Sequence, residues 1–221
     1  MIQLTRSIPI VFANVADPVG SGFVASFSRP GGNITGFVNF DGSLGGKWLE
    51  LLKELAPSVR HVAFMFNPIT ASFADYFLDP FKAAAHSLAV EAISGPVHDE
   101  SELESVIATI AGKQNAGLIA MPETFLNVHR SKVVSMAADY RLPAVYPYRF
   151  FAELGGLLSF GPDPLDNFRQ ATTYVDRILK GDKPPDLPVQ APTKYDLVVN
   201  IRTAKALDLT APRSLISRPT R

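Results

Sequence analysis

The chain has 221 residues, of which 47% are hydrophobic and 19% charged, and its 21 basic side chains balance 21 acidic ones. This length can bury a sizeable core in one or two domains, and the zero net charge argues against a nucleic-acid reader or a protein held on an anionic membrane. Because there is no cysteine and the four histidines are scattered, a thiolate nucleophile is excluded and a metal site is not expected.

Apolar runs and helical stripes alternate along the chain. Runs rich in β-branched and aromatic residues, bounded by Pro, Gly, Asn or Asp, predict buried strands. Strands are expected at residues 8–12, 34–40, 59–66, 89–93, 117–120, 143–146, 156–160 and 195–201. Apolar stripes at helical spacing predict helices at residues 45–55 and 168–179. Helices are also expected at residues 72–88, 102–111, 128–140 and 203–209, and a short helix is expected at residues 19–27, where the apolar residues have mixed spacing. The repeated order of strand and helix is typical of an α/β fold with a parallel sheet and right-handed crossovers.

Single residues and short segments refine this prediction. Trp48 lies on the apolar stripe of its helix, so core packing is favoured over a ligand role. Residues 83–85 form a small-residue patch suited to close packing, and Thr203 is a plausible helix cap. The proline-rich segment 182–194 predicts an extended connector, and the tail 213–221 has no periodicity and is expected to be loose.

The N-terminal segment does not resemble an export signal. Residues 1–15 contain one Arg and a brief apolar run but no small-residue cleavage site, and no apolar run approaches the ~18 residues of a membrane span. A buried strand begins at about Ile8 instead. We therefore expect that part of the protein upstream of this strand is missing.

Motifs for cofactor chemistry and nucleophilic catalysis are absent from the sequence. No GxxxxGK followed by Ser or Thr, no GxGxxG and no GxSxG occurs. A hydrolase would need an activated nucleophile or water, and none is visible. The sequence therefore predicts a protein that is not an enzyme and has no cofactor.

Polar and aromatic side chains follow the predicted strands, especially within the stretch 142–163. They are Asn14, Asp17, Asn67, Thr70, Glu123, Thr124, Phe125, Tyr146, Tyr148, Arg149 and Asp163. Ligands of open α/β sheets bind at the carboxyl ends of the strands. Asp, Arg and Asn can fix the charged groups of a small zwitterion, and Tyr and Phe can enclose an aromatic body. For Asp17, Glu123 and Asp163, a cap or turn is the more common role of the residue type.

Four blocks carry a resemblance to a known family. They are IPIVFANVADPVGSGFVASFSRPGGNITGF, GGKWLELLKELAP, RLPAVYPYRFFAELGGLLSFGPD and YVDRILKGDKPPDLPVQAPTKYDLVVNIRTAKALDLT. Together they resemble the ABC-transporter substrate-binding proteins of the tryptophan/tyrosine type (the TrpX-like family), over residues 7–215. The resemblance implies a type I periplasmic-binding-protein fold, with two α/β lobes that close on a ligand by a hinge. It assigns residues 1–57 to an incomplete first lobe, 58–160 to the second lobe and 161–221 to a segment that returns between them.

The resemblance also implies a function. The chain would capture an aromatic amino acid or a related aromatic carboxylate in the periplasm, for the permease and ATPase of an importer. Family members are monomers, but an incomplete sheet exposes a strand edge that can pair in a dimer. The alternatives are a ligand-sensing domain of a transcription regulator, an enzyme on a similar scaffold, and a truncated copy without function.

Overall fold

The computed structural model describes residues 5–216, whose contacts divide the chain into two compact units. The first unit comprises the residues up to Gly42 and Pro162–Tyr195, and the second comprises Ser43–Gly161 and the residues from Asp196 onward. The chain therefore passes between the units three times. The first helix, Leu44–Leu55, and the last strand, Asp196–Val199, both pack within the second unit.

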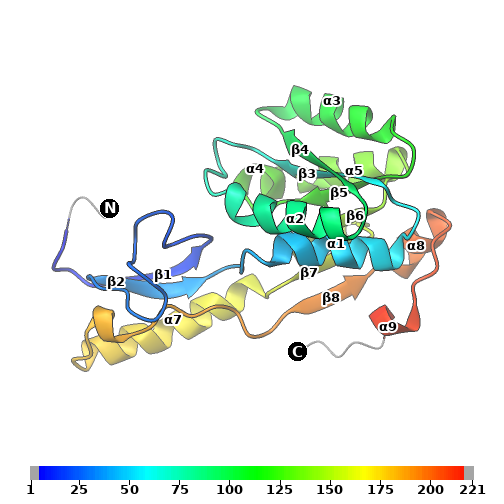
Figure 1. Cartoon of the computed structure of the whole chain (residues 1–221). Helices are drawn as coiled ribbons and strands as arrows, with labels where there is room; N and C mark the ends of the chain where they lie inside the picture. Colours follow the sequence, from blue (N-terminus) through cyan, green and yellow to red (C-terminus); the bar gives the residue numbers. More distant parts are fainter. Residues whose placement is uncertain (1–4, 217–221) are drawn as a thin grey trace. The chain divides into compact units, whose positions relative to one another are not determined.

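A six-stranded sheet forms the centre of the second unit (Figure 1). Its strands are β3 (His61–Phe66), β4 (Glu91–Pro96), β5 (Ala116–Ala120), β6 (Ala144–Tyr146), β7 (Leu158–Gly161) and β8 (Asp196–Val199). Their spatial order is β4-β3-β5-β6-β7-β8. The first five strands are parallel, as predicted, whereas β8 runs antiparallel to β7. A short apolar run is compatible with a parallel or an antiparallel strand, so the sequence does not predict that β8 is antiparallel.

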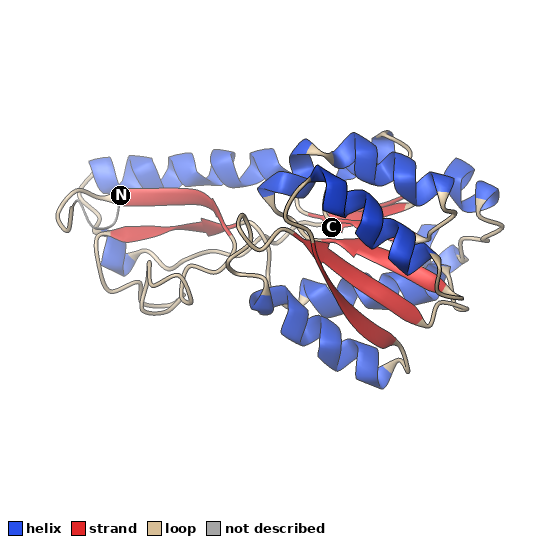
Figure 2. Cartoon of the chain, turned by 90° about the horizontal axis from the view of Figure 1, so that it is seen from above, coloured by secondary structure: helices blue, strands red, loops and turns tan. Residues whose placement is uncertain are grey.

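Helices cover both faces of this sheet (Figure 2). They are α1 (Leu44–Leu55), α2 (Asp75–Ser87), α3 (Glu100–Ala111), α4 (Thr124–Val128), α5 (Arg130–Asp139), α6 (Arg149–Glu153), α8 (Ile201–Ala206) and α9 (Arg213–Ile216). Helices α1 and α2 pack against each other, while α5 contacts α3 and α6. This is the doubly wound arrangement expected when strands and helices alternate.

The core of the second unit surrounds Trp48 on the buried face of α1. The indole ring is fully buried between Phe64 and Phe77, with centroid distances of 6.0 and 5.7 Å. Its Nε1 donates a hydrogen bond of 2.7 Å to the carbonyl oxygen of Phe160. The predicted core role of Trp48 is therefore confirmed.

The first unit has a parallel pair of strands, β1 (Ile10–Val15) and β2 (Ile34–Val38), and a long helix, α7 (Pro164–Leu179). The short 3-10 helix η1 (Pro184–Asp186) follows α7. The predicted connector 182–194 then runs beside β2, where the Thr35 hydroxyl donates to the carbonyl of Leu187 at 2.5 Å. Phe37, Tyr174 and Leu187 form the apolar contact between β2, α7 and the connector.

The helix predicted for residues 19–27 is wrong. The segment forms consecutive turns in which the N–H of Ser21 donates to the carbonyl of Asp17 and that of Phe23 to Pro18. Gly22 has a φ of +69°, a left-handed conformation that does not continue a helix. The apolar residues here serve packing instead, since Val24 is buried against Ile34 and Val38.

Other helices differ from the prediction at their ends. The predicted helix 128–140 is divided at His129 into α4 and α5, and α6 was not predicted because it has only five residues. Asn200 rather than Thr203 caps α8, since its Oδ1 accepts from the N–H groups of Arg202 and Thr203 at 3.1 Å. The tail predicted to be loose includes α9, where Leu215 is buried.

Two expectations reach beyond the described part of the chain. The N-terminal segment judged not to be a signal includes residues 1–4, and the loose tail includes residues 217–221, and both stretches lie outside the described residues. Within residues 5–216, no helix has the length and apolar character needed to cross a membrane.

Candidate functional site

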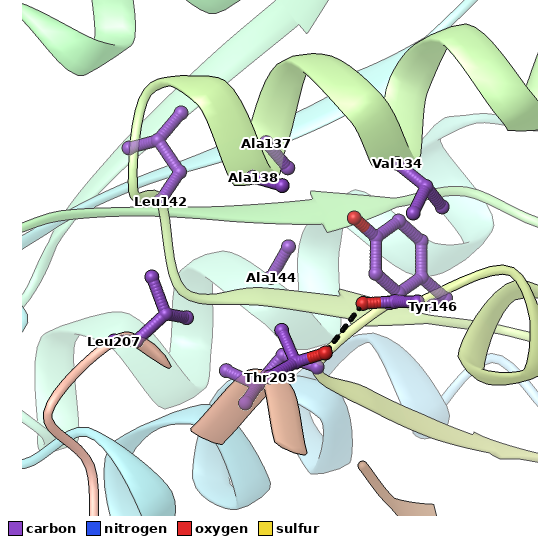
Figure 3. Close-up of a pocket in the computed structure, with 11 residues that line it drawn as sticks. Val134, Ala137, Ala138, Leu142, Ala144, Tyr146, Thr203 and Leu207 are labelled. Carbon is purple, nitrogen blue, oxygen red and sulfur yellow. Dashed lines mark hydrogen bonds between the residues drawn. The ribbon is translucent and has the colours of Figure 1, made fainter. Parts of the chain in front are cut away.

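The carboxyl end of β6 places Tyr146 in the protein core rather than on an open surface. Its side chain is 1% exposed and stacks on Phe151, with 5.0 Å between the ring centroids. Burial raises the pKa of the Tyr146 phenol well above its ordinary value. Figure 3 shows the ring beside Val134 and Ala144, at the wall of a cavity of about 10 Å³. That space holds one water molecule at most, so this cavity cannot enclose an amino acid.

Helix α8 and the residue that follows it, Leu207, contribute to the wall of the same cavity. The Thr203 hydroxyl donates a hydrogen bond of 2.8 Å to the carbonyl of Gly155 (Figure 3). Leu142 and Leu207 complete its apolar lining. These contacts join α8 to the loop before β7 and have a structural role.

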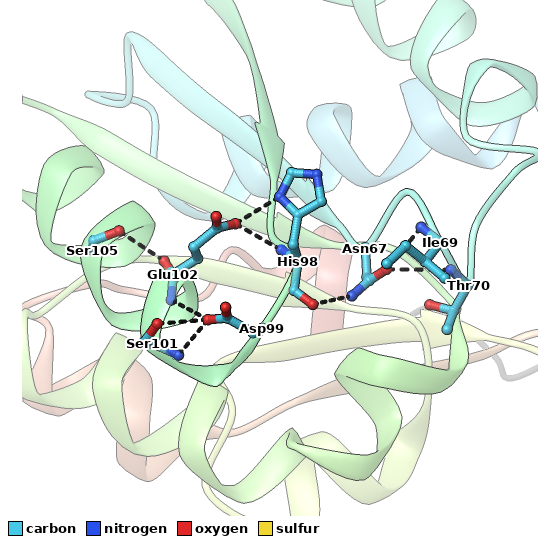
Figure 4. Close-up of polar contacts among 8 residues, drawn as sticks. All are labelled: Asn67, Ile69, Thr70, His98, Asp99, Ser101, Glu102 and Ser105. Atoms are coloured by element: carbon cyan, nitrogen blue, oxygen red, sulfur yellow. Dashed lines mark hydrogen bonds and ion pairs between the residues drawn. The ribbon is translucent and has the colours of Figure 1, made fainter.

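Asn67 organises the loop that follows β3 (Figure 4). Its side chain is 3% exposed, and its Oδ1 accepts from the N–H groups of Ile69 at 2.8 Å and Thr70 at 3.3 Å. Its Nδ2 donates to the carbonyl of His98 at 3.0 Å. Asn67 therefore shapes its own turn and ties it to the loop after β4.

Glu123 is a buried carboxylate at the carboxyl end of β5. It is 4% exposed and caps α4, where its Oε1 accepts from Leu126 N–H at 2.7 Å and its Oε2 from Phe125 N–H at 2.6 Å. The Thr70 hydroxyl donates to the same Oε2. Three donors thus compensate the burial of this charge. The contact also holds the exposed Thr70 loop against the β5 loop.

The first turn of α3 adds a second group of charges near this loop (Figure 4). Asp99 caps α3, and the Ser101 hydroxyl, followed by the backbone N–H of Glu102, lowers the pKa of its carboxyl. Glu102 accepts from both the backbone N–H and the Nδ1 of His98, at 2.8 and 2.7 Å. The backbone contact is the larger cause that lowers the pKa of Glu102. Both carboxylates stay ionised at the helix N-terminus, where negative charge is favourable.

Four aromatic rings form a continuous stack after β6. Tyr148 stacks on Phe150 at 5.1 Å, Phe150 on Phe151 at 5.0 Å, and Phe151 on Tyr146. The Arg130 guanidinium lies 5.6 Å from the centroid of Phe150. Tyr148 is 8% exposed, so this stack presents little aromatic surface of its own.

Arg149 is the exposed cation of this segment. Its Nε pairs with Glu153 Oε1 at 2.9 Å, one helical turn further along α6. The two side chains are 60% and 61% exposed, and such exposed pairs are weak. Arg149 can therefore exchange this partner for another anion at small cost.

The three predicted residues of the first unit lie at strand and helix ends. Asn14 is exposed near the end of β1, and its Oδ1 lies 3.4 Å from the Nδ2 of Asn167. Asp17 accepts from the N–H of Gly20 at 2.8 Å, within a turn. Asp163 caps α7 by accepting from Leu165 N–H at 2.9 Å. Asp17, Asp163 and Glu123 therefore all make the cap or turn contacts that their residue types favour.

The second unit brings one subset of the predicted residues together. Hydrogen bonds connect Asn67, Thr70, Glu123 and Phe125 into one cluster at the carboxyl ends of β3 and β5, with Thr124 exposed beside it. Tyr146, at the end of β6, stacks on Phe151 instead. This cluster has the position, at the ends of parallel strands, at which α/β proteins bind ligands.

Comparison with known proteins identifies the family of the chain. The sequence profile described as "ABC transporter substrate binding protein" matches residues 1–221. The chain belongs to this family. A curated relative of this substrate-binding protein is the tyrosine-binding protein of Clostridioides difficile strain R20291, which is 27% identical over 209 residues. The match covers 93% of the chain but only 58% of the length of that relative.

Solved structures share the fold of this substrate-binding protein. A conserved domain protein from Vibrio cholerae is 27% identical with a TM-score of 0.88, over 98% of this chain and 72% of its own. A Streptococcus pneumonia ABC domain in complex with L-Trp is 24% identical with a TM-score of 0.86, over 97% and 71% of the two chains. The substrate-binding protein therefore has the type I periplasmic-binding-protein fold, as expected.

The structure adds polar residues that the sequence analysis missed. Asn39, Asn127 and Ser159 each have a buried side-chain oxygen for which the described residues provide no hydrogen-bond partner. Asn39 follows β2 directly, but the strand was predicted to run to residue 40, so Asn39 was placed inside it and not at its end. Asn127 and Ser159 lie inside α4 and β7, where no local sequence signal marks them.

Proposed function

We propose that this chain is the solute-binding component of an ABC importer and that its ligand is an aromatic amino acid or a related aromatic carboxylate. The observation that carries this proposal is the 27% identity, over 93% of the chain, with a protein named for tyrosine binding. The similar fold of a protein solved in complex with L-Trp supports the same ligand class.

The accessible side chains of the candidate site have the chemistry that such a ligand needs. We assign the ligand carboxylate to Arg149, because its present ion pair is exposed and weak. The Thr70 and Thr124 hydroxyls offer polar contacts, and the half-buried ring of Phe125 offers an aromatic one. From the first unit, we assign Asn14 and Asp163 to the polar groups of the ligand, including its ammonium.

The remaining predicted residues take a supporting role in this proposal. Asn67, Glu123 and Asp17 use their side-chain oxygens to shape loops, and Tyr146 and Tyr148 are buried in the aromatic stack. The four residues of the second unit would hold the loops that carry Thr70, Phe125 and Arg149, and Asp17 would hold its own turn in the first unit. Binding sites require such support, because small displacements of a contact group weaken binding.

We further propose that the ligand is captured by closure of the two lobes about a hinge, which is the way periplasmic binding proteins act. The loaded protein would then deliver its ligand to the permease and ATPase subunits of the importer, outside the cytoplasmic membrane. The chain would work without a cofactor and without catalysis. It would bind and release an unchanged solute.

Thermal unfolding with a ligand panel tests this function. The panel contains tryptophan, tyrosine, phenylalanine, aliphatic amino acids and aromatic acids. A ligand at about 100 times its dissociation constant adds roughly 2.7 kcal/mol, which raises the midpoint of this chain by roughly 5 to 10 °C. A rise confined to the aromatic compounds supports the proposal. A rise for aliphatic compounds alone, or for none, contradicts the proposed ligand class.

A pair of matched arginine variants tests the assignment of the carboxylate contact. Arg149→Ala is expected to weaken binding of the panel ligand at least tenfold, because it removes a charge-assisted contact. The control is Arg141→Ala: Arg141 is 61% exposed and pairs with Asp208 at 2.7 Å, so it matches Arg149 in exposure and pairing. Isothermal titration with both variants measures the difference. Equal affinities would refute the role of Arg149 but leave the ligand class standing.

A further inference from the structure

His129 forms the joint between α4 and α5 in the second unit. It is the C-cap of α4, with a φ of −90° and a ψ of 16°, and α5 begins at the next residue. Its ring lies against the ring of Phe125, four residues earlier, with 4.4 Å between the centroids and 43° between the planes. Its backbone N–H donates to the carbonyl of Phe125 at 3.0 Å. Residues four apart face each other on a helix, so His129 is a direct neighbour that restricts the Phe125 ring.

Helix α3 places a carboxylate near the same imidazole. Oε2 of Glu100 lies 4.0 Å from Nδ1 of His129. Oε1 of Glu100 accepts a hydrogen bond of 2.9 Å from Lys132 of α5. This hydrogen bond, followed by the charge of Lys132, lowers the pKa of Glu100. Glu100 is therefore ionised throughout the range between about pH 5 and 8 in which histidine side chains change charge.

The other charges on the helices around His129 have contacts of their own. Lys132 also pairs with Glu104 of α3 at 3.0 Å. The guanidinium of Arg130 is directed to the aromatic stack after β6. The carboxylate of Glu123 accepts hydrogen bonds within the cap of α4. The two cations oppose a positive charge on His129, and the carboxylates favour it.

We propose that His129 is a positioning residue that holds the Phe125 ring for an aromatic ligand, and that protonation of His129 tightens binding. This inference rests on the proposed function, in which Phe125 is the aromatic contact of the ligand. A cation close to an aromatic ring is attracted by it, and ionised Glu100 attracts the same cation. Both effects favour the present orientation of Phe125. They reduce the freedom that the ring loses when a ligand binds.

The expected effect is small, because His129 acts through Phe125 and does not touch the ligand. We expect aromatic amino acids to bind about twofold to fivefold more tightly at pH 5.5 than at pH 8, the factor that corresponds to a weak cation–π contact. Coupling between two binding events is reciprocal. The uptake of an aromatic amino acid is therefore expected to be accompanied by the uptake of part of a proton.

Isothermal titration with L-tyrosine and L-tryptophan at pH 5.5 and pH 8 measures this dependence. Titrations between these pH values, in two buffers of different ionisation enthalpy, measure the uptake of protons. Equal affinity at both pH values overturns the inference and leaves the proposed function standing. A native chain that binds neither amino acid at either pH contradicts the proposed function, and this inference with it.

Two variants of residue 129 separate the ring from its charge. His129→Phe keeps an aromatic ring against Phe125 and removes the proton, so it is expected to bind at both pH values with the affinity of the native chain at pH 8. His129→Ala also removes the ring and is expected to bind aromatic amino acids more weakly than the native chain at both pH values. A pH dependence that persists in His129→Phe overturns the inference.

Two other histidines provide controls. The side chain of His61 is 29% exposed, against 26% for His129, and lies 3.4 Å from Glu91. It begins β3, so it lies at the end of the sheet opposite to the candidate site. His98 lies beside the site and pairs with Glu102. His61→Gln and His98→Gln are both expected to retain the pH dependence of the native chain, and its loss in His98→Gln would overturn the assignment to His129.

A matched pair of glutamates tests the part played by α3. Glu100→Gln removes the carboxylate near His129, whereas Glu104→Gln removes a carboxylate that pairs with the same Lys132. The two glutamates are 56% and 62% exposed. Glu100→Gln is expected to reduce the change in affinity between pH 5.5 and pH 8 more than Glu104→Gln does. Equal responses would contradict the role assigned to Glu100.

A double-mutant cycle without ligand tests the contact between the two rings. The native chain, His129→Ala, Phe125→Ala and the double variant are compared by denaturant unfolding. Residues in contact show a coupling in the free energy of unfolding, so the loss in the double variant is expected to differ from the sum of the two single losses. Additive losses would show that His129 does not hold Phe125 and would overturn the inference.

Discussion

At the scale of single residues, the phenol of Tyr146 shows how burial fixes a protonation state. The ring stacks on Phe151 and is enclosed by the apolar wall of a water-sized cavity. Burial disfavours the charged phenolate and raises its pKa above the ordinary value near 10. The folded protein therefore keeps this proton at a pH at which the unfolded chain has lost it.

This difference predicts a loss of stability at alkaline pH. Below pH 10 the folded and the unfolded protein both hold the proton of the Tyr146 phenol, so the free energy of unfolding is not reduced by this group. Above pH 10 the unfolded state binds fewer protons than the folded state, so the free energy of unfolding falls as pH rises. Tyr146→Phe keeps the stacked ring and is expected to show a shallower fall in unfolding midpoint between about pH 9 and 11. Tyr140→Phe removes a phenol at a 46% exposed site and is the control. If the unfolding midpoints of the native protein and of Tyr146→Phe fell equally steeply with pH, the predicted contribution of Tyr146 would be wrong.

The sequence predicts which residues lie at strand ends. It does not predict which of them make hydrogen bonds to their own loops and which remain available to a ligand. Glu123 and Asn67 were selected as ligand contacts because they follow apolar strands. In the structure their oxygens accept hydrogen bonds from their own loops. Asp, Glu and Asn serve caps and ligands equally well, so only the three-dimensional list of donors separates the two roles. Asn39 was missed because the predicted strand, residues 34–40, extended two residues beyond the end of β2 and contained it.

At the scale of elements, the crossing of α1 and α2 depends on two glycines. A Cβ atom on Gly45 would lie 2.1 Å from the carbonyl oxygen of Phe77, and one on Gly46 would lie 3.3 Å from the Cβ of Ala84. Ala84 belongs to the predicted small-residue patch 83–85 and lies at this crossing, whereas Ala83 of the same patch is exposed. The two backbones approach more closely than ordinary side chains would allow.

Gly45→Ala is accordingly expected to destabilise the protein by about 1–3 kcal/mol, because the helices must move apart. At this chain length each kcal/mol lowers the unfolding midpoint by roughly 2–4 °C. Gly112→Ala is the matched control, since a Cβ there meets only ordinary contacts at 3.5 Å and its φ of −68° suits alanine. Differential scanning calorimetry measures both variants. Similar midpoints for the two would show that the crossing can relax without cost.

Buried strands and long helices were predicted, whereas a helix as short as α6 was not. The helix at 45–55 and the strands at 59–66 and 117–120 lie within two residues of their expected limits. The five-residue α6 contains too little of a helical period to be recognised. The error at 19–27 came from apolar residues at mixed spacing, which pack in the core from a chain of turns.

At the scale of the whole molecule, the two units differ in how their sheets are built. Strands β2 and β5 are both five residues long and fully buried. Strand β5 has a parallel neighbour on each side, whereas β2 pairs along its length with β1 and otherwise with a single bridge from Phe37 to Gln190. Two-stranded sheets are only marginally stable by themselves.

We therefore expect the amides of β2 to exchange with solvent before those of β5, by roughly a hundredfold in rate. Equal burial of the two strands makes this comparison a measure of cooperative stability rather than of exposure. Hydrogen exchange followed by mass spectrometry resolves the two segments. Equal protection of β2 and β5 would mean that the units unfold together.

The position of Trp48 has a practical consequence. It is the sole tryptophan of the chain, and its indole is buried among Phe64, Phe77 and the carbonyl of Phe160, all in the second unit. Intrinsic fluorescence is therefore a local optical probe that reports on that unit alone. Circular dichroism averages over both units, so the two signals should give different denaturation midpoints whenever the first unit melts early.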